Sequence, residues 1–169
     1  MADYTQNARY VINSFLWEEL KNNNVLNEND YRPDGFTKSI IPIVPSQELP
    51  EFNNLLPNKT YLLYDYEIEG YSDDWFICEE SMIYSIISTD YSKISQITEL
   101  MIDLFRRVDI SGQDVQLFNP KDDLIKFYSV SLEGASSPTP FESEGSTMIG
   151  QIQISYKYSR VLGNNGRFS

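Results

Sequence analysis

Carboxylates are the side chains in this sequence most able to do chemistry. Seven of them fall within sixteen positions of one segment: Asp65, Glu67, Glu69, Asp73, Asp74, Glu79 and Glu80. Asp65 and Glu67 alternate, so on a strand they share one face, as the acid pair of a glycosidase would. A glycosidase also needs a raised carboxyl pKa inside a cleft, which sequence does not reveal. The segment therefore predicts an acidic surface, either a solvated hairpin or a face that repels DNA or attracts a basic partner.

The other residue types that carry catalysis or hold metals are scarce. The chain has no histidine, which removes the usual general base, the usual zinc ligand and the Ser/His/Asp triad. It has no glycine-rich phosphate motif, and neither "DYRPDGFTK" nor "SDDWFICEE" has the ligand order of an EF-hand. We therefore expect no enzyme activity, no catalytic residue, no cofactor and no metal site.

The one cysteine, Cys78, lies between Ile77 and Glu79 in an apolar segment. This position predicts a packed thiol rather than a nucleophile, because a base partner is hard to find. A single cysteine excludes an internal disulfide and fits a reducing compartment.

The charge balance limits the partners of the chain. Thirteen Lys and Arg face 25 Asp and Glu, which gives a formal net charge of −12. A DNA-binding protein needs clustered basic residues to displace condensed counterions, so this excess of acidic residues argues against electrostatic binding to nucleic acid. No apolar run approaches the roughly 20 residues that cross a bilayer, and "MADYTQNARY" contains no apolar signal segment. We expect no membrane contact and a protein that stays where it is made.

Two segments have the apolar spacing of amphipathic helices. The first covers residues 5–22, and its apolar face consists of Ala8, Val11, Ile12, Phe15, Leu16 and Leu20. The second lies within residues 88–109, and its apolar face consists of Ile94, Ile97, Met101, Leu104, Phe105 and Val108. Thr89 and Asp90 are suited to cap the start of this second helix, and Arg106–Arg107 suit the negative end of its dipole. Both helices should dock on a sheet.

Several segments are rich in strand formers. "TYLLYDYEIEG" and "DWFICEESMIYSIIS" should pair as an antiparallel hairpin, with a bulge or break at Glu79–Glu80 where the alternation fails. "LIKFYSVSLEG" and "TMIGQIQISYKYSR" predict two later strands. "SIIPIVPSQ" contains two prolines and can only be an edge strand or an extended arm. A short helix between Ser111 and Pro120 completes the expected elements.

These elements predict one α+β domain over residues 1–169, with helices packed on a small antiparallel or mixed sheet. Hydrophobic residues make up 41% of the chain, which is enough for a core. We expect an extended arm at about residues 39–50, a projecting loop at about 133–146 and a tail without core residues at about 161–169.

The order of the central elements is similar to that of a known group of proteins. "YLLYDYEIEGYSDDWFICEESMIYSIIST" leads directly into "DYSKISQITELMIDLFRRVD", after an N-terminal helix and before two late strands. This order resembles the neck and tail-terminator proteins of long-tailed bacteriophages. The segment "STDYSKISQITELMIDLFRRVD" is similar to the corresponding segment in versions carried by phages of marine bacteria, such as cyanophages. The element order covers about residues 4–160, and the detailed pattern covers about residues 60–109.

The resemblance implies an α/β fold in which copies assemble as a hexameric ring on the head-proximal end of the tail tube. Such a ring stops growth of the tail tube protein and offers a surface to head-completion, or connector, proteins; in contractile phages it lies next to the tail sheath. It also implies a virion protein of the tail or neck, assembled in the host cytoplasm. The arm and the loop are inserts of the kind that differs among members, so the resemblance transfers no contact to them.

Two sets of residues are candidates for contacts in such an assembly. The partner-binding candidates are Arg106, Arg107, Phe141, Glu142 and Glu144. The candidates for a lumen or acidic surface are Asp65, Glu67, Glu69, Asp73 and Asp74. A carboxylate-rich lumen would let DNA pass without specific binding, and a neighbouring subunit can close an unpaired strand edge or a proline arm.

Other functions are open at this point. The chain fits a head-closure or tail-completion protein of the same neck, and it fits a monomeric acidic module that mimics nucleic acid or blocks a host factor. The mass in solution separates these classes, because a ring favours a neck protein and a clean monomer favours the acidic module.

Overall fold

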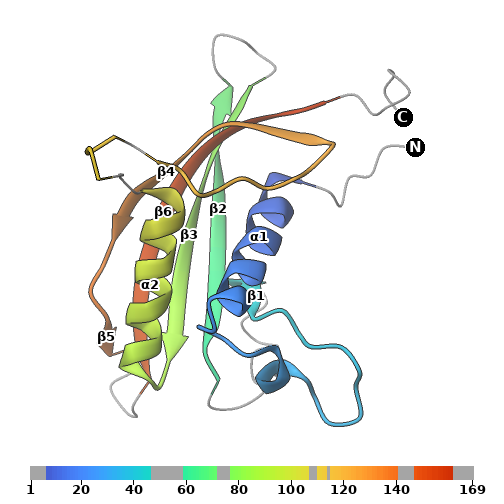
Figure 1. The fold of residues 1–169 in the computed structure, drawn as a ribbon, viewed down its shortest axis with the longest axis vertical. Helices are drawn as coiled ribbons and strands as arrows, with labels where there is room; N and C mark the ends of the chain where they lie inside the picture. Colours follow the sequence, from blue (N-terminus) through green and yellow to red (C-terminus); the bar gives the residue numbers. More distant parts are fainter. Residues whose placement is uncertain are drawn as a thin grey trace.

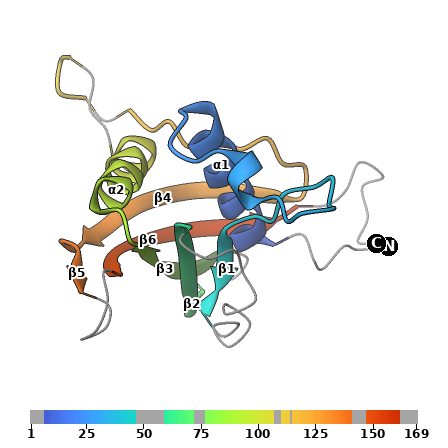
Figure 2. The same cartoon turned by 90° about the horizontal axis from the view of Figure 1, so that it is seen from below.

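The computed structural model describes residues 7–46, 59–71, 77–106, 110–113, 115–140 and 147–161. Two α-helices, α1 (Ala8–Asn22) and α2 (Tyr91–Phe105), lie on one face of a mixed six-stranded sheet, which is the predicted α+β class (Figure 1). Figure 2 shows both helices on the same side of the sheet. Neither helix has the length and apolar character that spanning a bilayer requires, within this part of the chain.

The sheet has the strand order β1-β2-β3-β6-β4, with the short β5 paired to β6. Its strands are β1 (Ile43–Pro45), β2 (Tyr61–Tyr71), β3 (Cys78–Ser88), β4 (Ile125–Ala135), β5 (Thr139–Pro140) and β6 (Met148–Arg160). The β1–β2 pair is parallel and the other pairs are antiparallel. The predicted β2–β3 hairpin is confirmed, and the proline-rich arm supplies an edge strand.

Helix α1 begins where the sequence offers a cap. The Asn7 side chain accepts a hydrogen bond from the Tyr10 amide, which satisfies a free donor of the first turn. The predicted apolar face is buried, with Phe15 partly so. Trp17 is buried as well, against Tyr31 of the 3₁₀ helix η1 (Glu28–Tyr31), with ring centroids 5.9 Å apart.

Helix α2 also follows its predicted pattern. Asp90 caps it by accepting from the Ser92 amide, and five residues of the predicted apolar face are buried: Ile94, Ile97, Met101, Leu104 and Phe105. The helix lies very close to β6 at Gly150, where a Cβ atom would be 2.8 Å from Cγ2 of Ile94. Arg106 is not helical but is the C-cap residue, with φ −153° and ψ 92°. Val108 lies outside the described residues.

The alternation of β3 differs from the prediction. We expected a bulge or break at Glu79–Glu80. The pairing is irregular at this point, but β3 is continuous and the extra residue lies on its partner β2, between Ile68 and Gly70, which pair with Glu80 and Glu79. Glu80 points to the same face of the sheet as Met82, toward the core, because polar side chains there bind its carboxylate. The alternation of β6 is as predicted, with Ile152, Ile154 and Tyr156 facing the helices.

Two connections also differ from the prediction. The described residues between Ser111 and Pro120 contain no helix; instead an extended connection runs back to β4. Phe118 anchors this connection in the core. The centroid of its ring lies 5.0 Å from the ring centroid of Phe15, 5.6 Å from that of Phe105 and 5.2 Å from that of Phe127. Part of the predicted loop at 133–146 is strand, namely the end of β4 and all of β5, whereas residues 141–146 lie outside the described residues.

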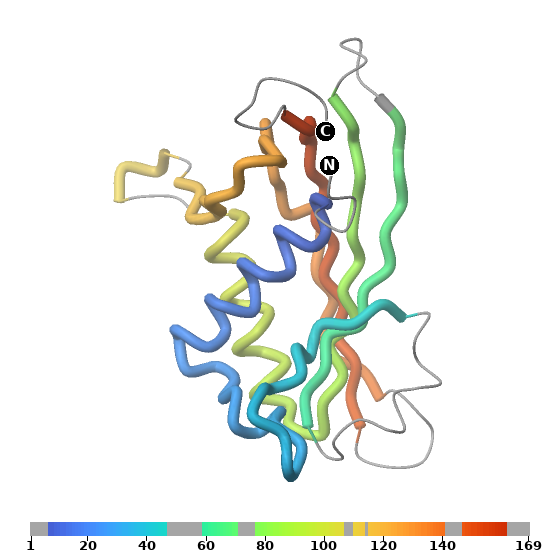
Figure 3. Tube along the Cα trace, turned by 90° about the vertical axis from the view of Figure 1, so that its right-hand side faces the viewer, coloured from blue at the N-terminus to red at the C-terminus, as the bar shows by residue number. Residues whose placement is uncertain are grey.

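Figure 3 shows the sheet from the side, with both helices against one face. The opposite face of the sheet is called here the outer face. It carries Glu67 of β2, Ser81 of β3, and Ser155 and Lys157 of β6, because these residues alternate with core residues. Ser131 of β4 pairs with Ser155 and shares this face.

Candidate functional site

The most concentrated polar chemistry in the described residues surrounds a buried carboxylate, Glu80. Its side chain is 2% exposed. Arg9 of α1 approaches with Nη1 3.2 Å from Oε1 and 3.1 Å from Oε2. The hydroxyls of Tyr156 and Tyr158 donate to Oε2 and Oε1, each at 2.8 Å. We call these four residues the Glu80 cluster; it joins the first turn of α1 to β3 and β6.

The environment of the cluster fixes its protonation chemistry. Burial raises the pKa of Tyr156 well above its ordinary value, and the Glu80 carboxylate raises it further. The same two causes raise the pKa of Tyr158. Burial alone would lower the pKa of Arg9, but the charge of Glu80 outweighs it, and the net shift is upward. The cluster is therefore an ion pair held by neutral hydroxyl donors.

The cluster is better suited to stabilising the fold than to catalysis. Both carboxylate oxygens are already engaged by protein donors, whereas a general base must reach a substrate proton. The guanidinium of Arg9 is also held by its stack on Tyr66, 3.8 Å from the ring centroid. Cys78 is buried nearby, with Sγ 3.9 Å from Oε1 of Glu80, and burial raises the pKa of its thiol. This supports the interpretation of Cys78 as a packed thiol.

A second feature is the unpaired half of β2. Strand β1 pairs only with residues Leu62, Leu63 and Tyr64, so no described strand covers residues 65–71, which we call the β2 edge. Tyr66 and Ile68, on the helix side of the β2 edge, are 48% and 57% exposed. The acids Asp65 and Glu67 alternate with them on the outer face.

A third feature is a groove beside the last strand. Strand β4 pairs with β6 on one side, and no described strand pairs with its other side. A cleft of about 550 Å³ separates β4 from the connection, lined by residues that include Phe118, Phe127 and Tyr128. A second cleft, of about 420 Å³, continues along β4, lined by residues that include Phe105, Arg106, Val115 and Leu132. We call the two clefts the β4 groove.

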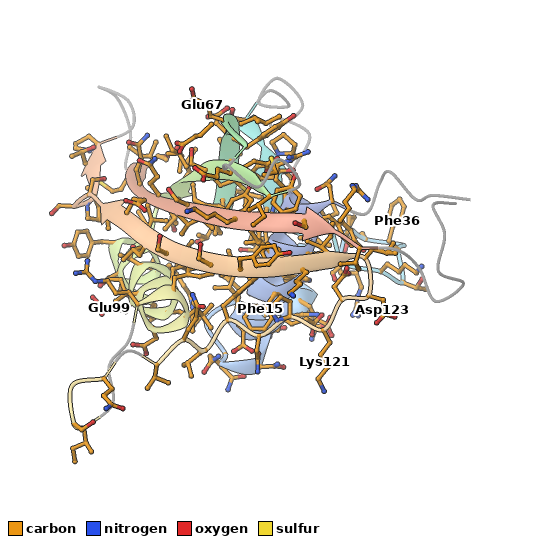
Figure 4. The ribbon with its side chains drawn as sticks, turned by 90° about the horizontal axis from the view of Figure 1, so that it is seen from above. Phe15, Phe36, Glu67, Glu99, Lys121 and Asp123 are labelled. Carbon is orange, nitrogen blue, oxygen red and sulfur yellow. The ribbon has the colours of Figure 1, made fainter. Side chains whose placement is uncertain are left out.

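Gln116 and Val130 line both parts of the β4 groove. The side-chain amide of Gln116 donates a hydrogen bond to the backbone carbonyl of Val130, so Gln116 bridges the groove from the connection to the strand. Figure 4 shows Glu67 on the side of the sheet opposite Phe15, and Lys121 and Asp123 on the connection. The β2 edge and the β4 groove are at opposite ends of the strand order.

The predicted site residues are distributed over these features. Arg106 is exposed and lines the β4 groove. Asp65, Glu67 and Glu69 are exposed on the β2 edge. The remaining candidates lie outside the described residues: Asp73, Asp74, Arg107, Phe141, Glu142 and Glu144. The described residues contain no group of three or more His, Cys, Asp or Glu that could hold a metal ion.

Sequence reasoning missed the Glu80 cluster and the β4 groove. A signal for the cluster existed, because Glu80 occupies a core position in the alternation of an apolar strand, where a carboxylate needs partners. No comparable signal marks the groove, since it depends on how far the connection stands from β4.

Neither the protein-family models nor the curated proteins compared with this chain gave a match. We therefore infer function from the geometry described above.

Proposed function

We propose that this protein is a structural subunit of a phage neck: a tail terminator whose copies form a ring on the tail tube and join it to head-completion proteins. The observation that carries the proposal is the pair of strand edges that no described strand covers: the part of β2 beyond β1, and the outer side of β4. An unpaired edge offers backbone donors and acceptors to another chain, and two different edges on one subunit allow head-to-tail assembly.

The charge supports the same function. A net charge of −12 disfavours binding to DNA, which is what a ring around a DNA channel requires. Asp65, Glu67 and Glu69 place negative charge on the exposed β2 edge. The buried Glu80 cluster gives each subunit internal cohesion without contributing a reactive group.

The test is to label the chain in the virion. We expect a labelled copy to appear by electron microscopy at the junction of head and tail, and we expect the purified chain to bind isolated tail tubes at one end. Tubes assembled without the protein should exceed their normal length. Label elsewhere in the virion, or tubes of normal length without the protein, would contradict the proposal.

The same experiment separates a related function. A head-closure or tail-completion protein would also be found in the neck, but it would bind purified heads or sheathed tails instead of the bare tube. A protein that stays monomeric and binds no virion component would instead fit the acidic binding module.

A further inference from the structure

We propose that the β2 edge of one copy pairs with β4 of the next copy and lies in its β4 groove, so that one sheet continues from subunit to subunit. This inference rests on the proposed ring function and names the contact that would build the ring. The occupant of the groove is a second copy of this chain.

The direction of the strands permits this pairing. Strands β2 and β3, β3 and β6, and β6 and β4 are antiparallel in turn, so β2 and β4 run in opposite directions within one subunit. A second copy in the same orientation can be placed beside β4 so that the sheet continues. Its β2 is then the antiparallel neighbour of β4. The contact joins two different edges, so it is head-to-tail and closes into a ring when the rotation between copies allows.

The two edges also lie at the same position along the strands. Ile68, Glu80, Tyr156 and Val130 occupy one rung across four strands. The next rung whose side chains face the helices contains Tyr66, Met82, Ile154 and Leu132. A continued sheet in this register places Ile68 and Tyr66 of one copy beside Val130 and Leu132 of the next. The contact ends there, because one rung pair further Ala135 and the neighbouring copy's own Pro45 would compete for Tyr64, so the end of β4 has to leave the sheet.

The surfaces that meet are complementary on the helix side. Ile68 and Tyr66 are large side chains that are partly exposed in the single subunit, with one face of the Tyr66 ring stacked on Arg9. The groove beside Val130 and Leu132 is lined by apolar groups that include Phe105 and Val115. Moving the exposed groups into the groove removes apolar surface from water on both copies, which favours association.

Charge favours this pairing over a pairing of two β2 edges. The β2 edge carries Asp65, Glu67 and Glu69 and no basic residue. The other edge is mixed in charge: Lys126 of β4 and Arg106 lie near the groove, but so do Asp122, Asp123 and Glu133. Pairing two β2 edges would instead bring like charges together.

Disulfide trapping tests the pairing directly. Glu67 and Ser131 lie on one rung of the outer face, through Ser81 and Ser155. Within a subunit three strand spacings, about 14 Å, separate them, which is too far for a disulfide. Between copies they would be neighbours. The variant Glu67→Cys/Ser131→Cys is made in a Cys78→Ser background and oxidised with diamide, which converts two thiols to one disulfide.

We expect a ladder of disulfide-linked dimers, trimers and larger species that disappears on reduction. Either single-cysteine variant should give at most a trace of dimer. The matched control is Ser92→Cys/Ser131→Cys, with one cysteine on the exposed start of α2, and it should give no ladder. Absence of a ladder, an equal ladder from the control, or strong dimers from Ser131→Cys alone would overturn the pairing.

A second variant pair keeps the inference testable without cysteines. Ile68→Asp changes a group that is 57% exposed, so the subunit should keep its melting temperature while the concentration for half-maximal association rises at least tenfold. The control Ile110→Asp changes a fully exposed isoleucine that belongs to neither strand and lines neither cleft, so it should leave association unchanged. Equal association of both variants and the wild type would contradict the inference.

The outcomes for the two proposals remain distinguishable. Labelled wild-type protein at the neck without a disulfide ladder would reject the pairing and keep the proposed function. A ladder in a protein that is absent from the neck would support the pairing and reject the proposed function.

Discussion

Arg9 and Glu80 bring opposite charges together inside a protein whose surface is strongly acidic. The carboxylate is 2% exposed and the arginine side chain 19%, so solvent screens this pair much less than a surface pair. The adjacent Glu79 faces outward and meets Lys157 at 3.6 Å, with side-chain exposures of 34% and 51%. Two neighbouring residues therefore offer a matched comparison of a buried and an exposed ion pair.

We predict that Glu80→Gln lowers the free energy of unfolding by about 2 kcal/mol, because it leaves the partly buried Arg9 guanidinium without a counter-charge. Glu79→Gln should cost less than about 0.5 kcal/mol, since its pair is exposed. Urea unfolding of both variants measures the difference. Equal losses would mean that the Glu80 cluster adds no more than a surface contact.

The buried tyrosines predict a loss of stability at high pH. The unfolded chain ionises tyrosine near pH 10, whereas burial raises the pKa of Tyr156, Tyr158 and Tyr84 in the folded chain. The unfolded state therefore releases protons first. Their contribution to stability is complete below about pH 10 and falls as the pH rises, by about 1.4 kcal/mol per pH unit for each tyrosine.

Urea unfolding between about pH 8 and about pH 11 checks this slope. Tyr156→Phe should make the slope shallower by the share of one tyrosine, whatever it does to stability at neutral pH. Tyr91→Phe, at a site that is 59% exposed, should leave the slope unchanged. An unchanged slope in Tyr156→Phe would show that this hydroxyl ionises as easily in the folded chain as in the unfolded one.

At the scale of elements, α2 depends on close contact with the sheet. A Cβ atom at Gly150 of β6 would lie 2.8 Å from Cγ2 of Ile94, a branched side chain that is fully buried and has little room to turn. We predict that Gly150→Ala costs about 1 to 3 kcal/mol through overpacking. Thermal or urea unfolding measures it.

Gly134 of β4 provides the control for this prediction. No atom lies within 4 Å of its hypothetical Cβ, and Gly134 is not among the glycines with positive φ. Gly134→Ala should therefore leave stability within about 0.5 kcal/mol of the wild type. Equal stability of the two variants would mean that α2 can move away from the sheet without cost.

Elements with a complete local pattern were predictable from sequence. Asp90 followed by apolar residues at steps of three and four identified α2, and strict alternation identified β6 and its core face. Glu80 was misjudged because its partner Arg9 is 71 positions away, and local alternation cannot register a distant charge. The helix expected before Pro120 failed because tertiary contacts of Phe118 hold that connection extended.

At the scale of the whole molecule, charge dominates the expected behaviour toward nucleic acid. With a net charge of −12, the chain gains nothing from the counterions that duplex DNA would release. We predict no retardation of duplex DNA in an electrophoretic shift assay at physiological salt, at protein concentrations up to tens of micromolar. Binding that weakens steeply with added salt would reveal a basic surface. It would argue against the proposal that DNA passes the protein without being bound.

The hydrogen bond from Gln116 to the Val130 carbonyl has a consequence for the timing of assembly. A strand that enters the groove has to compete with the Gln116 side chain for the Val130 carbonyl. The Gln116 bond forms within one subunit and requires no second molecule. The net value of such a bond is about 1 kcal/mol, which corresponds to about a fivefold weaker association. Because this internal competitor does not depend on concentration, it is most effective when the subunit is dilute. Under the proposed pairing, this bond raises the concentration needed for association about fivefold, so pairing would begin where several copies are brought together.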